Sequence, residues 1–350
     1  MLHFDHLSLL LLFIFLFLIF KKFNILLDNV EYSPHKNVIN FDRKPLLLGG
    51  IYIFISILLF FSNEHNNLKI FSFLILLLGI ASDKNYINNS ILRLILQIFS
   101  LILFVFFENL NISSIKFNIF DNLLQNNYFN IFFTTFCIAI LINGTNFIDG
   151  LNSLVSNYFI IVILALLILN KHYLNFQIDN IYEIKILLFV LIVFTFFNFF
   201  GYTFLGDSGS YLISFILGYF LINIYNQNQD ISPYFIVLLL WYPAFENLFS
   251  IIRRLFNKIH FSNADNLHLH HLILNSFKRK SSNKFLNSYI SLLIIFYNLI
   301  IFFFSIKFYY HTKILIMIIF INILVYLVTY YYLKKKRIIK FKLNLTHLNL

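Results

Sequence analysis

Long apolar runs, separated by short polar segments, dominate this chain of 350 residues. We count eleven such runs, and most approach the length of about 20 residues that an α-helix needs to cross a bilayer. Water is absent from the hydrocarbon core, so backbone N–H and C=O groups there must be paired within helices or a closed barrel. The runs are too long and too uniformly apolar for barrel strands. The sequence therefore predicts an all-α, polytopic membrane protein.

The composition agrees with this fold class. Charged residues make up 12% of the chain, whereas soluble domains carry about a quarter. The single cysteine, Cys137, lies within an apolar run, so we expect no disulfide framework and no cysteine metal site. The first run begins almost at Met1 without a small-residue cleavage site, and we interpret it as an uncleaved anchor. We expect a single integral-membrane domain over 1–350. The predicted spans are 5–20, 46–62, 68–82, 91–107, 128–142, 153–169, 184–200, 209–225, 232–249, 286–306 and 313–333.

The distribution of Lys and Arg predicts the orientation. With these spans, one side of the membrane receives twenty of the 26 basic residues and the other receives six. Because cytoplasmic loops are enriched in Lys and Arg, the first side is predicted to be cytoplasmic, with the N-terminus outside. The enrichment of Lys and Arg in cytoplasmic loops then explains the net charge of +11, and we expect no nucleic-acid partner. The predicted cytoplasmic segments are 21–45, 83–90, 143–152, 201–208 and 250–285, with a basic tail at 334–350.

Four polar sequence clusters fall on this predicted cytoplasmic side. Three of them place a carboxylate at the end of a span, where a buried charge is costly unless it is paired or used. Each cluster alone is also explained as a turn, an ion pair or a solvated histidine loop, but their common side favours a shared site. The clusters are GIASDKN with Asp83, NGTNFIDGLNSL with Asn143, Asn146, Asp149 and Asn152, FLGDSGS with Asp207, and NADNLHLHHLIL with Asp265, His268, His270 and His271.

The residue types in these clusters indicate a chemistry. Carboxylates without thiols at a membrane–water boundary suit Mg²⁺, which binds one or two carboxylates together with substrate phosphates and water. Gly206 and Gly209 would let the backbone approach a ligand. Arg253, Arg254 and the histidines would supply positive charge to phosphates. Together they predict phosphoryl transfer, with one substrate from the cytosol and one entering sideways from the bilayer.

The clusters, in this order, resemble the polyprenyl-phosphate N-acetylhexosamine-1-phosphate transferases. GIASDKNYINNSILRLILQ is similar to that family's acidic-pair motif with a downstream Arg and Gln, here Arg93 and Gln97. NGTNFIDGLNSL resembles its Asn-x-x-Asn-x-x-Asp-Gly motif and FLGDSGS its Mg²⁺ motif. YPAFENLFSIIRR and DNLHLHH resemble its Pro–acid–Arg-Arg segment and His-x-His-His loop, and PLLLGGIYIF the start of its second span. The resemblance covers about Asp28 to Leu274.

The resemblance implies a reaction. A UDP-N-acetylhexosamine donates its sugar 1-phosphate to undecaprenyl phosphate, which releases UMP and starts a lipid-linked glycan of the cell wall or lipopolysaccharide. It also implies Mg²⁺, with Mn²⁺ as a substitute, and a bacterial inner membrane location with the active site facing the cytoplasm. Direct attack and a covalent aspartyl intermediate both stay open, as does a homodimer.

The resemblance also implies roles for individual residues. Asp207 would bind Mg²⁺ on the donor diphosphate, Phe204 would stack on uracil, and Asp83 would deprotonate or orient the lipid phosphate. The other implied site residues are Asn146, Asp149 and Gly150 around the nucleotide and reacting phosphates, Arg93 at the lipid phosphate, and His268, His270 and His271 at the donor's phosphates or sugar.

Two positions depart from the family pattern. Ser82 stands where the first acid of the pair is expected, so a role that needs both acids has only Asp83. Asn152 stands where the family often has a second Asp. An amide both donates and accepts hydrogen bonds, so Asn152 can keep a contact with the nucleotide.

Three other functions stay open on the sequence. The phospho-muramoyl-pentapeptide translocase of peptidoglycan synthesis belongs to the same superfamily, but its loop has three consecutive histidines, unlike DNLHLHHL. A membrane transporter usually places carboxylates near the midplane on broken helices with related halves, whereas these acids lie at span ends. A lipid-binding scaffold without turnover is the third alternative.

Overall fold

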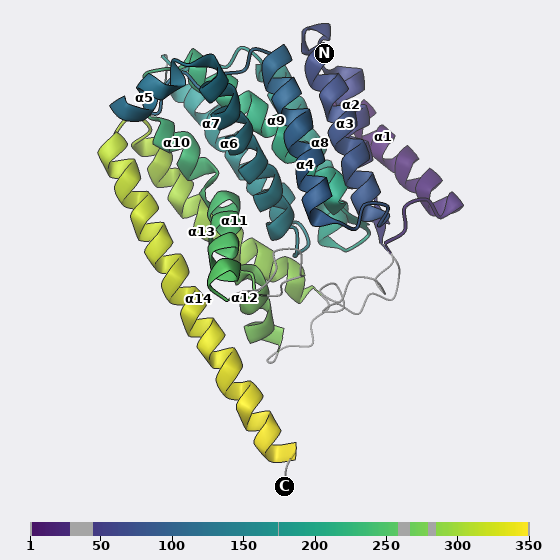
Figure 1. Cartoon of the computed structure of the whole chain (residues 1–350). Coiled ribbons are helices and arrows are strands. Elements are labelled where there is room, and N and C mark those ends of the chain that lie inside the picture. The colour runs from purple at the N-terminus through teal and green to yellow at the C-terminus, as the bar shows by residue number, and fades with distance from the viewer. Residues whose placement is uncertain (1, 29–44, 174, 258–266, 279–284, 349–350) are drawn as a thin grey trace.

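A computed structural model describes residues 2–28, 45–173, 175–257, 267–278 and 285–348, with side chains described from 5 to 336 within these ranges. Long helices pack side by side, with α5 toward one end of the bundle and α12 toward the other (Figure 1). The described elements are α1 (Leu2–Phe23), β1 (Leu46–Leu47), α2 (Gly49–Phe60), η3 (Asn63–His65), α3 (Asn66–Asp83), α4 (Ser90–Phe107), α5 (Asn118–Leu124), α6 (Asn127–Ile148), α7 (Leu154–His172), α8 (Ile181–Phe199), β2 (Thr203–Phe204), α9 (Gly206–Gln227), α10 (Pro233–Leu239), α11 (Trp241–Phe256), α12 (Leu269–Lys278), α13 (Leu286–Lys307) and α14 (Thr312–Leu348).

The predicted helical, polytopic membrane fold is confirmed, whereas only nine or ten of the eleven predicted spans have the length and composition of a crossing helix in the described part of the chain. Among the described residues, nine helices are long and apolar enough to cross a membrane. The consecutive helices α10 and α11 are bent by 76° and make a tenth span only if they are taken together. The predicted span 46–62 contains α2, which has 12 residues and reaches only about 18 Å at ~1.5 Å per residue. That length is well short of a hydrocarbon core of about 30 Å.

Helix α9 lies at the centre of the bundle. Its apolar window is 89% buried, and α2, α3 and α6 pack around it. A Cβ atom added at Gly79 of α3 would lie 2.2 Å from the Cα of Ser208. Glycine at this position therefore lets the backbones of α3 and α9 touch near the end of α3 that carries Asp83.

A short parallel β-pair, which the sequence did not predict, fixes the entry into α9. Leu46 of β1 lies opposite Thr203 of β2, directly before α9 begins. Asn198 near the end of α8 supports the same connection, because its Nδ2 donates to the Thr203 carbonyl at 2.6 Å. The Asn198 Oδ1 also accepts a hydrogen bond from the backbone N–H of Ser153, which precedes α7. One amide thus joins the loops that lead into α7 and α9.

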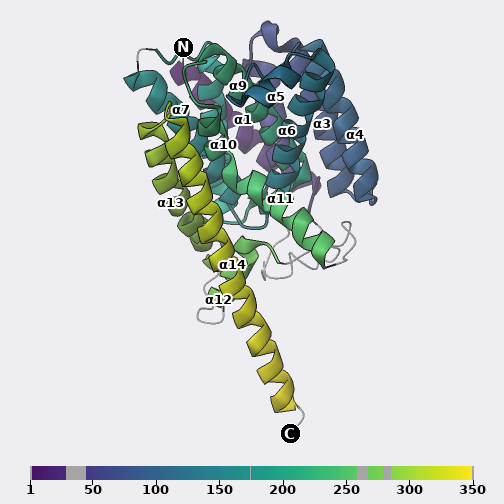
Figure 2. The same ribbon diagram turned by 60° about the vertical axis from the view of Figure 1, so that its left-hand side comes forward.

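Helix α14 lies at the edge of the bundle and continues past it. It packs along α10 and α12, and both views show it projecting beyond α12 (Figures 1 and 2). Its 37 residues correspond to about 55 Å, more than a membrane core requires. The predicted basic tail at 334–350 therefore begins as a continuation of α14. Of the predicted cytoplasmic segments, 29–44, 258–266 with Asp265, and 279–284 lie outside the described residues.

A buried polar network occupies the opposite end of α3. His65, directly before α3, has its Nε2 at 3.7 Å from Oε1 of Glu183 on α8. Tyr219 of α9 donates to Oε1 of Glu108 at 3.0 Å, and its hydroxyl lies 3.4 Å from His65 Nδ1. His65 and Glu183 are 4% and 7% exposed. These polar groups are paired with one another inside the protein.

Candidate functional site

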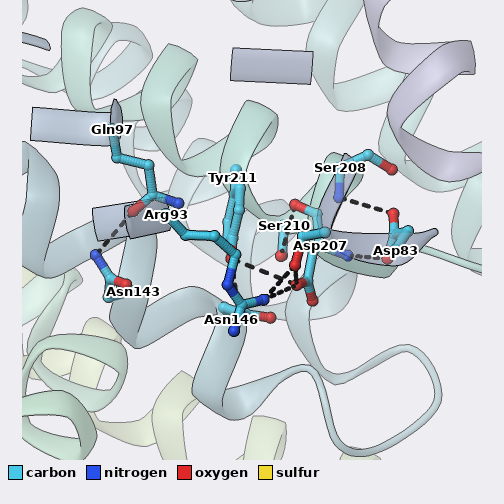
Figure 3. Close-up of polar contacts among 10 residues, drawn as sticks. Asp83, Arg93, Gln97, Asn143, Asn146, Asp207, Ser208, Ser210 and Tyr211 are labelled. Carbon is cyan, nitrogen blue, oxygen red and sulfur yellow. Dashed lines mark hydrogen bonds and ion pairs between the residues drawn. The ribbon is translucent and has the colours of Figure 1, made fainter. Parts of the chain in front are cut away.

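The first group of polar side chains lies where α3, α4 and α9 meet (Figure 3). We call Ser82, Asp83, Arg93, Asp207 and Tyr211 the α9 cluster. Oδ2 of Asp207 is at its centre, since it accepts hydrogen bonds from Ser82 Oγ, from Arg93 Nη1 at 3.2 Å and from the Tyr211 hydroxyl at 3.4 Å. Arg93 Nη1 also donates to Ser82 Oγ. Ser82 therefore links the arginine to the aspartate.

The Asp83 carboxylate faces the backbone of α9. Its Oδ1 accepts the N–H of Asp207 at 2.9 Å, and its Oδ2 accepts the N–H of Ser208 at 3.1 Å. Gly206 has φ +72°, and a Cβ atom there would lie 2.8 Å from Oδ2 of Asp83. A Cβ at Gly209 would meet Leu205. Both glycines thus make room for neighbouring protein atoms, and the approach of a ligand at these positions stays a prediction.

The start of α4 explains why Arg93 reaches this cluster. The side chain of Asn89 caps α4 by accepting the N–H of Ile91 at 2.9 Å. Arg93 follows one turn later, and Gln97 lies four residues further on the same helix face. Gln97 is buried, and its Oε1 accepts a hydrogen bond from Nδ2 of Asn143 on α6 at 3.3 Å.

The C-terminal end of α6 borders two groups of polar side chains. Asn146 donates to the hydroxyl of Tyr211 at 3.4 Å and so contacts the α9 cluster. The ring of Phe147 lies 5.2 Å from that of His268, centroid to centroid. Asp149 follows α6 directly, two residues after Phe147, and is half-buried. The predicted nucleotide segment therefore connects the α9 cluster to the histidines.

The second group gathers around the start of α12. We call Gly150, Glu246, His268, His270 and His271 the histidine cluster. The rings of His268 and His270 are stacked at 5.7 Å, and those of His270 and His271 lie 4.3 Å apart. A Cβ atom at Gly150 would lie 2.6 Å from His270 Nε2 and 2.6 Å from His271 Nε2. Glycine is the residue that lets this loop lie against both histidines.

Glu246 is a member of this cluster that the sequence analysis did not select as a site residue. It is fully buried on α11, and its Oε1 lies 2.9 Å from Nδ1 of His268. Its Oε2 accepts a hydrogen bond from the hydroxyl of Tyr326 on α14 at 2.6 Å. Since a carboxylate only accepts, Nδ1 is the donor nitrogen of His268. A lone acid within an apolar segment was the available signal.

His270 is the most enclosed histidine of the cluster. It is fully buried, its Nδ1 lies 3.5 Å from the Tyr242 hydroxyl, and its Nε2 has no hydrogen-bond partner among the described residues. Burial, and then the neighbouring His271 and His268, lower the pKa of His270 well below its usual value. His270 is therefore neutral at neutral pH.

The remaining predicted residues are positioned by protein contacts. Arg253 Nη1 donates to the carbonyl of Leu267 at 2.8 Å, and its guanidinium lies 5.6 Å from the ring centre of Tyr330. Arg254 lies over the ring of Phe147 at 5.5 Å. Both arginines are buried, and Arg253 ties α11 to the segment that leads into the histidines. Phe204 is half-buried in β2, three residues before Asp207.

Asp207 carries the donor set that a hard cation prefers. Within the described part of the chain, no three His, Cys, Asp or Glu side chains gather at metal-ligand distances. A cation at Asp207 would therefore take most of its ligands from substrate phosphates and water, as Mg²⁺ commonly does. The side chain of Asp207 is 26% exposed, and its Oδ1 makes no hydrogen bond to a described residue. The residues present fit such a cation.

Comparison with known proteins relates the chain to a family and to a bacterial relative. Residues 65–225, from η3 to α9, match the family described as Glycosyl transferase family 4. The chain is also 24% identical over 278 residues to the "Probable undecaprenyl-phosphate N-acetylglucosaminyl 1-phosphate transferase" of Bacillus subtilis (strain 168). That alignment covers 73% of this chain and 72% of the relative. The matched family segment contains the whole α9 cluster, whereas α11, α12 and most of the histidine cluster follow it in the chain.

Proposed function

From the chain's membership of glycosyl transferase family 4, a family of transferase enzymes, we propose that it transfers N-acetylhexosamine 1-phosphate from a UDP-sugar to undecaprenyl phosphate. UMP is released, and the lipid product starts a cell-surface glycan. The observation that carries this proposal is the meeting of Asp207, Arg93 and Tyr211 at the N-terminus of α9, inside the segment matched by the family. The Bacillus subtilis relative, whose name gives this acceptor and sugar, supports N-acetylglucosamine as the hexosamine.

The α9 cluster provides the charges that two phosphate-bearing substrates require. Asp207 would hold Mg²⁺, which when bound neutralises charge on the donor diphosphate. Arg93, 29% exposed and 3.2 Å from Asp207, offers a planar guanidinium to the phosphate of the lipid. Tyr211 and Asn146 bridge this cluster to α6, so Asp149 and Gly150 lie at the place proposed for the nucleotide and the reacting phosphates.

The histidine cluster forms the wall that we assign to the donor's phosphates or sugar. Glu246 and Tyr326 fix the ring of His268, and the buried His270 holds Nε2 toward Gly150. Arg253 and Arg254 are proposed to stabilise the position of the histidine cluster, because Arg253 contacts Leu267 and Arg254 contacts Phe147. Phe204 is proposed to stack on uracil.

The orientation of the bundle follows from charge. We propose that the end that carries both clusters faces the cytoplasm. In the predicted layout this side holds twenty of the 26 Lys and Arg residues, and the layout keeps its order of sides because α2 leads from β1, which pairs with β2 just before α9, to His65 at the opposite end of α3. A reporter fused after Leu350 should then be cytoplasmic, and one within 108–127 should be outside. A cytoplasmic signal from 108–127 would overturn this orientation.

Product analysis with purified protein tests the proposal. The protein is incubated with undecaprenyl phosphate, Mg²⁺ and one donor at a time: UDP-N-acetylglucosamine, UDP-N-acetylgalactosamine or UDP-N-acetylmuramoyl-pentapeptide. We expect a lipid diphosphate carrying an N-acetylhexosamine. Turnover of the pentapeptide donor alone would favour the translocase of peptidoglycan synthesis, and substrate-independent ion flux in liposomes without any transfer would favour a transporter.

A further inference from the structure

We propose that Asp83 is a positioning residue that anchors the N-terminus of α9 and thereby sets the place of the Asp207 carboxylate. This inference rests on the proposed function and changes the part that the family resemblance implies for Asp83, which was to deprotonate or orient the lipid phosphate. The observation that carries it is that both oxygens of Asp83 accept backbone N–H groups of α9, from Asp207 at 2.9 Å and from Ser208 at 3.1 Å.

The bonding pattern is that of a helix cap supplied from another helix. The first N–H groups of an α-helix have no partner within the helix, and a side-chain carboxylate is a preferred acceptor for them. The residue directly before α9 is Leu205, which provides no side-chain cap. Asp83, 124 residues away in the chain, takes that place. The Asp83 carboxyl group also lies at the positive end of the α9 dipole, which favours an acceptor there.

The surrounding packing is shaped to keep this contact. Gly206 adopts φ +72°, and a Cβ atom there would lie 2.8 Å from Oδ2 of Asp83 and 3.0 Å from its Oδ1. Gly79 brings α3 against Ser208 one turn before α3 ends at Asp83. The end of α3 and the start of α9 are thus held against each other by backbone contact and by one carboxylate.

The consequence for Asp207 follows from its position. Asp207 is the second residue of α9, and its own N–H is one of the two that Asp83 binds. Any loosening of that hydrogen bond moves the Cα of Asp207 and therefore its carboxylate. A general base needs an oxygen within hydrogen-bond reach of the proton that it removes, whereas both Asp83 oxygens are directed at α9. Asp83 therefore acts on the reaction through Asp207.

A Mn²⁺ titration of the purified full-length protein tests this role, with free Mn²⁺ measured by electron paramagnetic resonance. The variants are Asp83→Asn, Asp83→Ser, Asp83→Ala and Asp207→Asn, with Lys84→Ala as the matched control at an exposed neighbour. Asn and Ser are good helix caps and Ala is a poor one. We expect Mn²⁺ affinity to fall about threefold in Asp83→Asn and Asp83→Ser and about tenfold in Asp83→Ala, consistent with a lost cap, and to be lost in Asp207→Asn. Lys84→Ala should match the wild type.

The pH profile of sugar-phosphate transfer provides a second readout. A positioning role predicts that any ionisation that Asp83→Asn removes from the profile is accompanied by weaker Mn²⁺ binding. Unchanged Mn²⁺ affinity, combined with loss of one limb of the profile in Asp83→Asn, would make Asp83 a general base and overturn the inference. If Asp83→Asn loses Mn²⁺ binding as completely as Asp207→Asn does, Asp83 is a metal ligand, and the inference is overturned as well.

Failure of the inference and failure of the proposed function can be told apart. If the wild type transfers no sugar phosphate, the proposed function fails, and the graded Mn²⁺ affinities still decide whether Asp83 positions Asp207. If the wild type retains no Mn²⁺ alone, the titration is repeated with UDP-N-acetylglucosamine, whose diphosphate would supply the remaining ligands. If no Mn²⁺ is retained then, Asp207 is not a metal residue and the positioning role falls with it. Should Asp83→Ala fail to fold, Asp83→Ser and Asp83→Asn carry the comparison.

Discussion

The α9 cluster and the histidine cluster border the same end of α6, yet they are built in opposite ways. In the α9 cluster, charged side chains face one another and remain accessible, with Arg93 at 29% and Asp207 at 26% exposure. In the histidine cluster, Glu246 and His270 are fully buried and the rings stack on one another. Charged groups at a water-accessible surface can exchange partners at little cost, whereas buried polar groups are costly to leave unpaired.

Under the proposed function, this contrast assigns the two clusters different parts in one site. We interpret the α9 cluster as the part that changes its charge partners when phosphates and a cation arrive. We interpret the histidine cluster as a fixed wall whose shape and hydrogen-bonding direction are set before the donor enters. Substitutions in the first should act on metal use and the chemical step, and substitutions in the second on the use of the donor.

The largest effect is expected from Asp207→Asn. The amide keeps the shape of the side chain but removes the charge that binds a cation, so turnover should fall by at least ~10²-fold, the scale of one lost electrostatic group. Expression and melting temperature should match the wild type. The measurement is the transfer rate over a Mg²⁺ titration. Normal turnover of Asp207→Asn at low Mg²⁺ would return Asp207 to the role of a turn residue.

Glu246→Gln should have the next largest effect and should separate the two clusters. Loss of the carboxylate removes a charged hydrogen bond from His268, so kcat/KM for the UDP-sugar should fall roughly tenfold, while the KM for the lipid changes little. Tyr326→Phe is the matched control, since it removes the other bond to Glu246 and should have a smaller effect. An equal rise in the KM for the UDP-sugar and the KM for the lipid would contradict the assignment of the histidine cluster to the donor.

Acidification should destabilise the histidine cluster. Burial lowers the pKa of His270 well below 6.5 in the folded protein, whereas the unfolded chain binds a proton near the usual value of about 6.5. The stabilisation by neutral His270 is therefore complete above about pH 6.5 and is lost as the pH falls below that value. Melting curves between pH 7.5 and 5 should show a smaller pH dependence in His270→Gln than in the wild type. Identical pH dependence of the two melting temperatures would show that His270 does not cause the loss of stability at low pH.

Ser82→Ala should have a smaller effect within the α9 cluster. It removes the hydroxyl between Arg93 and Asp207 but leaves their ion pair, so transfer should fall about threefold, the scale of one neutral hydrogen bond. Ser82→Thr keeps the hydroxyl and should be closer to the wild type. A loss in Ser82→Ala as severe as that of Asp207→Asn would show that Ser82 has a catalytic part.

The smallest effect on transfer is expected from Glu183→Gln at the opposite end of the bundle. This change breaks the buried contact with His65, so the melting temperature should fall because a buried polar group loses its partner. The transfer rate of the folded protein should stay within about twofold, since distant sites act independently. A large loss of transfer in folded protein would couple the two ends and undo the contrast drawn here.

The long helices were predictable because the bilayer, which acts as the solvent here, requires them. Long apolar runs must form helices in a bilayer, and the sequence located every described long helix. The number of crossing helices was not predictable, because the 12-residue α2 and the 76° bend between α10 and α11 look like ordinary apolar runs in sequence. The β1–β2 pair was also missed, since two residues in each strand leave no pattern.

The candidate site residues could be selected from the sequence by residue type, but the residues that they contact could not. Asp83 and Asp207 are separated by 124 residues, and no sequence spacing shows that one binds the backbone of the other. Glu246 was overlooked for the same reason, because its importance lies in its contacts with His268 and Tyr326 from two other segments. Gly206 was selected as a close-approach residue, and the side chain that approaches it in the structure is that of Asp83.

Transfer of the sugar together with its phosphate can be followed directly through the β-phosphorus of the donor. Purified protein is given UDP-N-acetylglucosamine labelled with ³²P at the β-phosphorus, undecaprenyl phosphate and Mg²⁺, and the label is counted in the lipid phase and in the released nucleotide. We expect the label to move into the lipid, the nucleotide product to be unlabelled UMP, and Asp207→Asn to abolish this transfer. Release of labelled UDP, with sugar but no label in the lipid, would contradict this expectation.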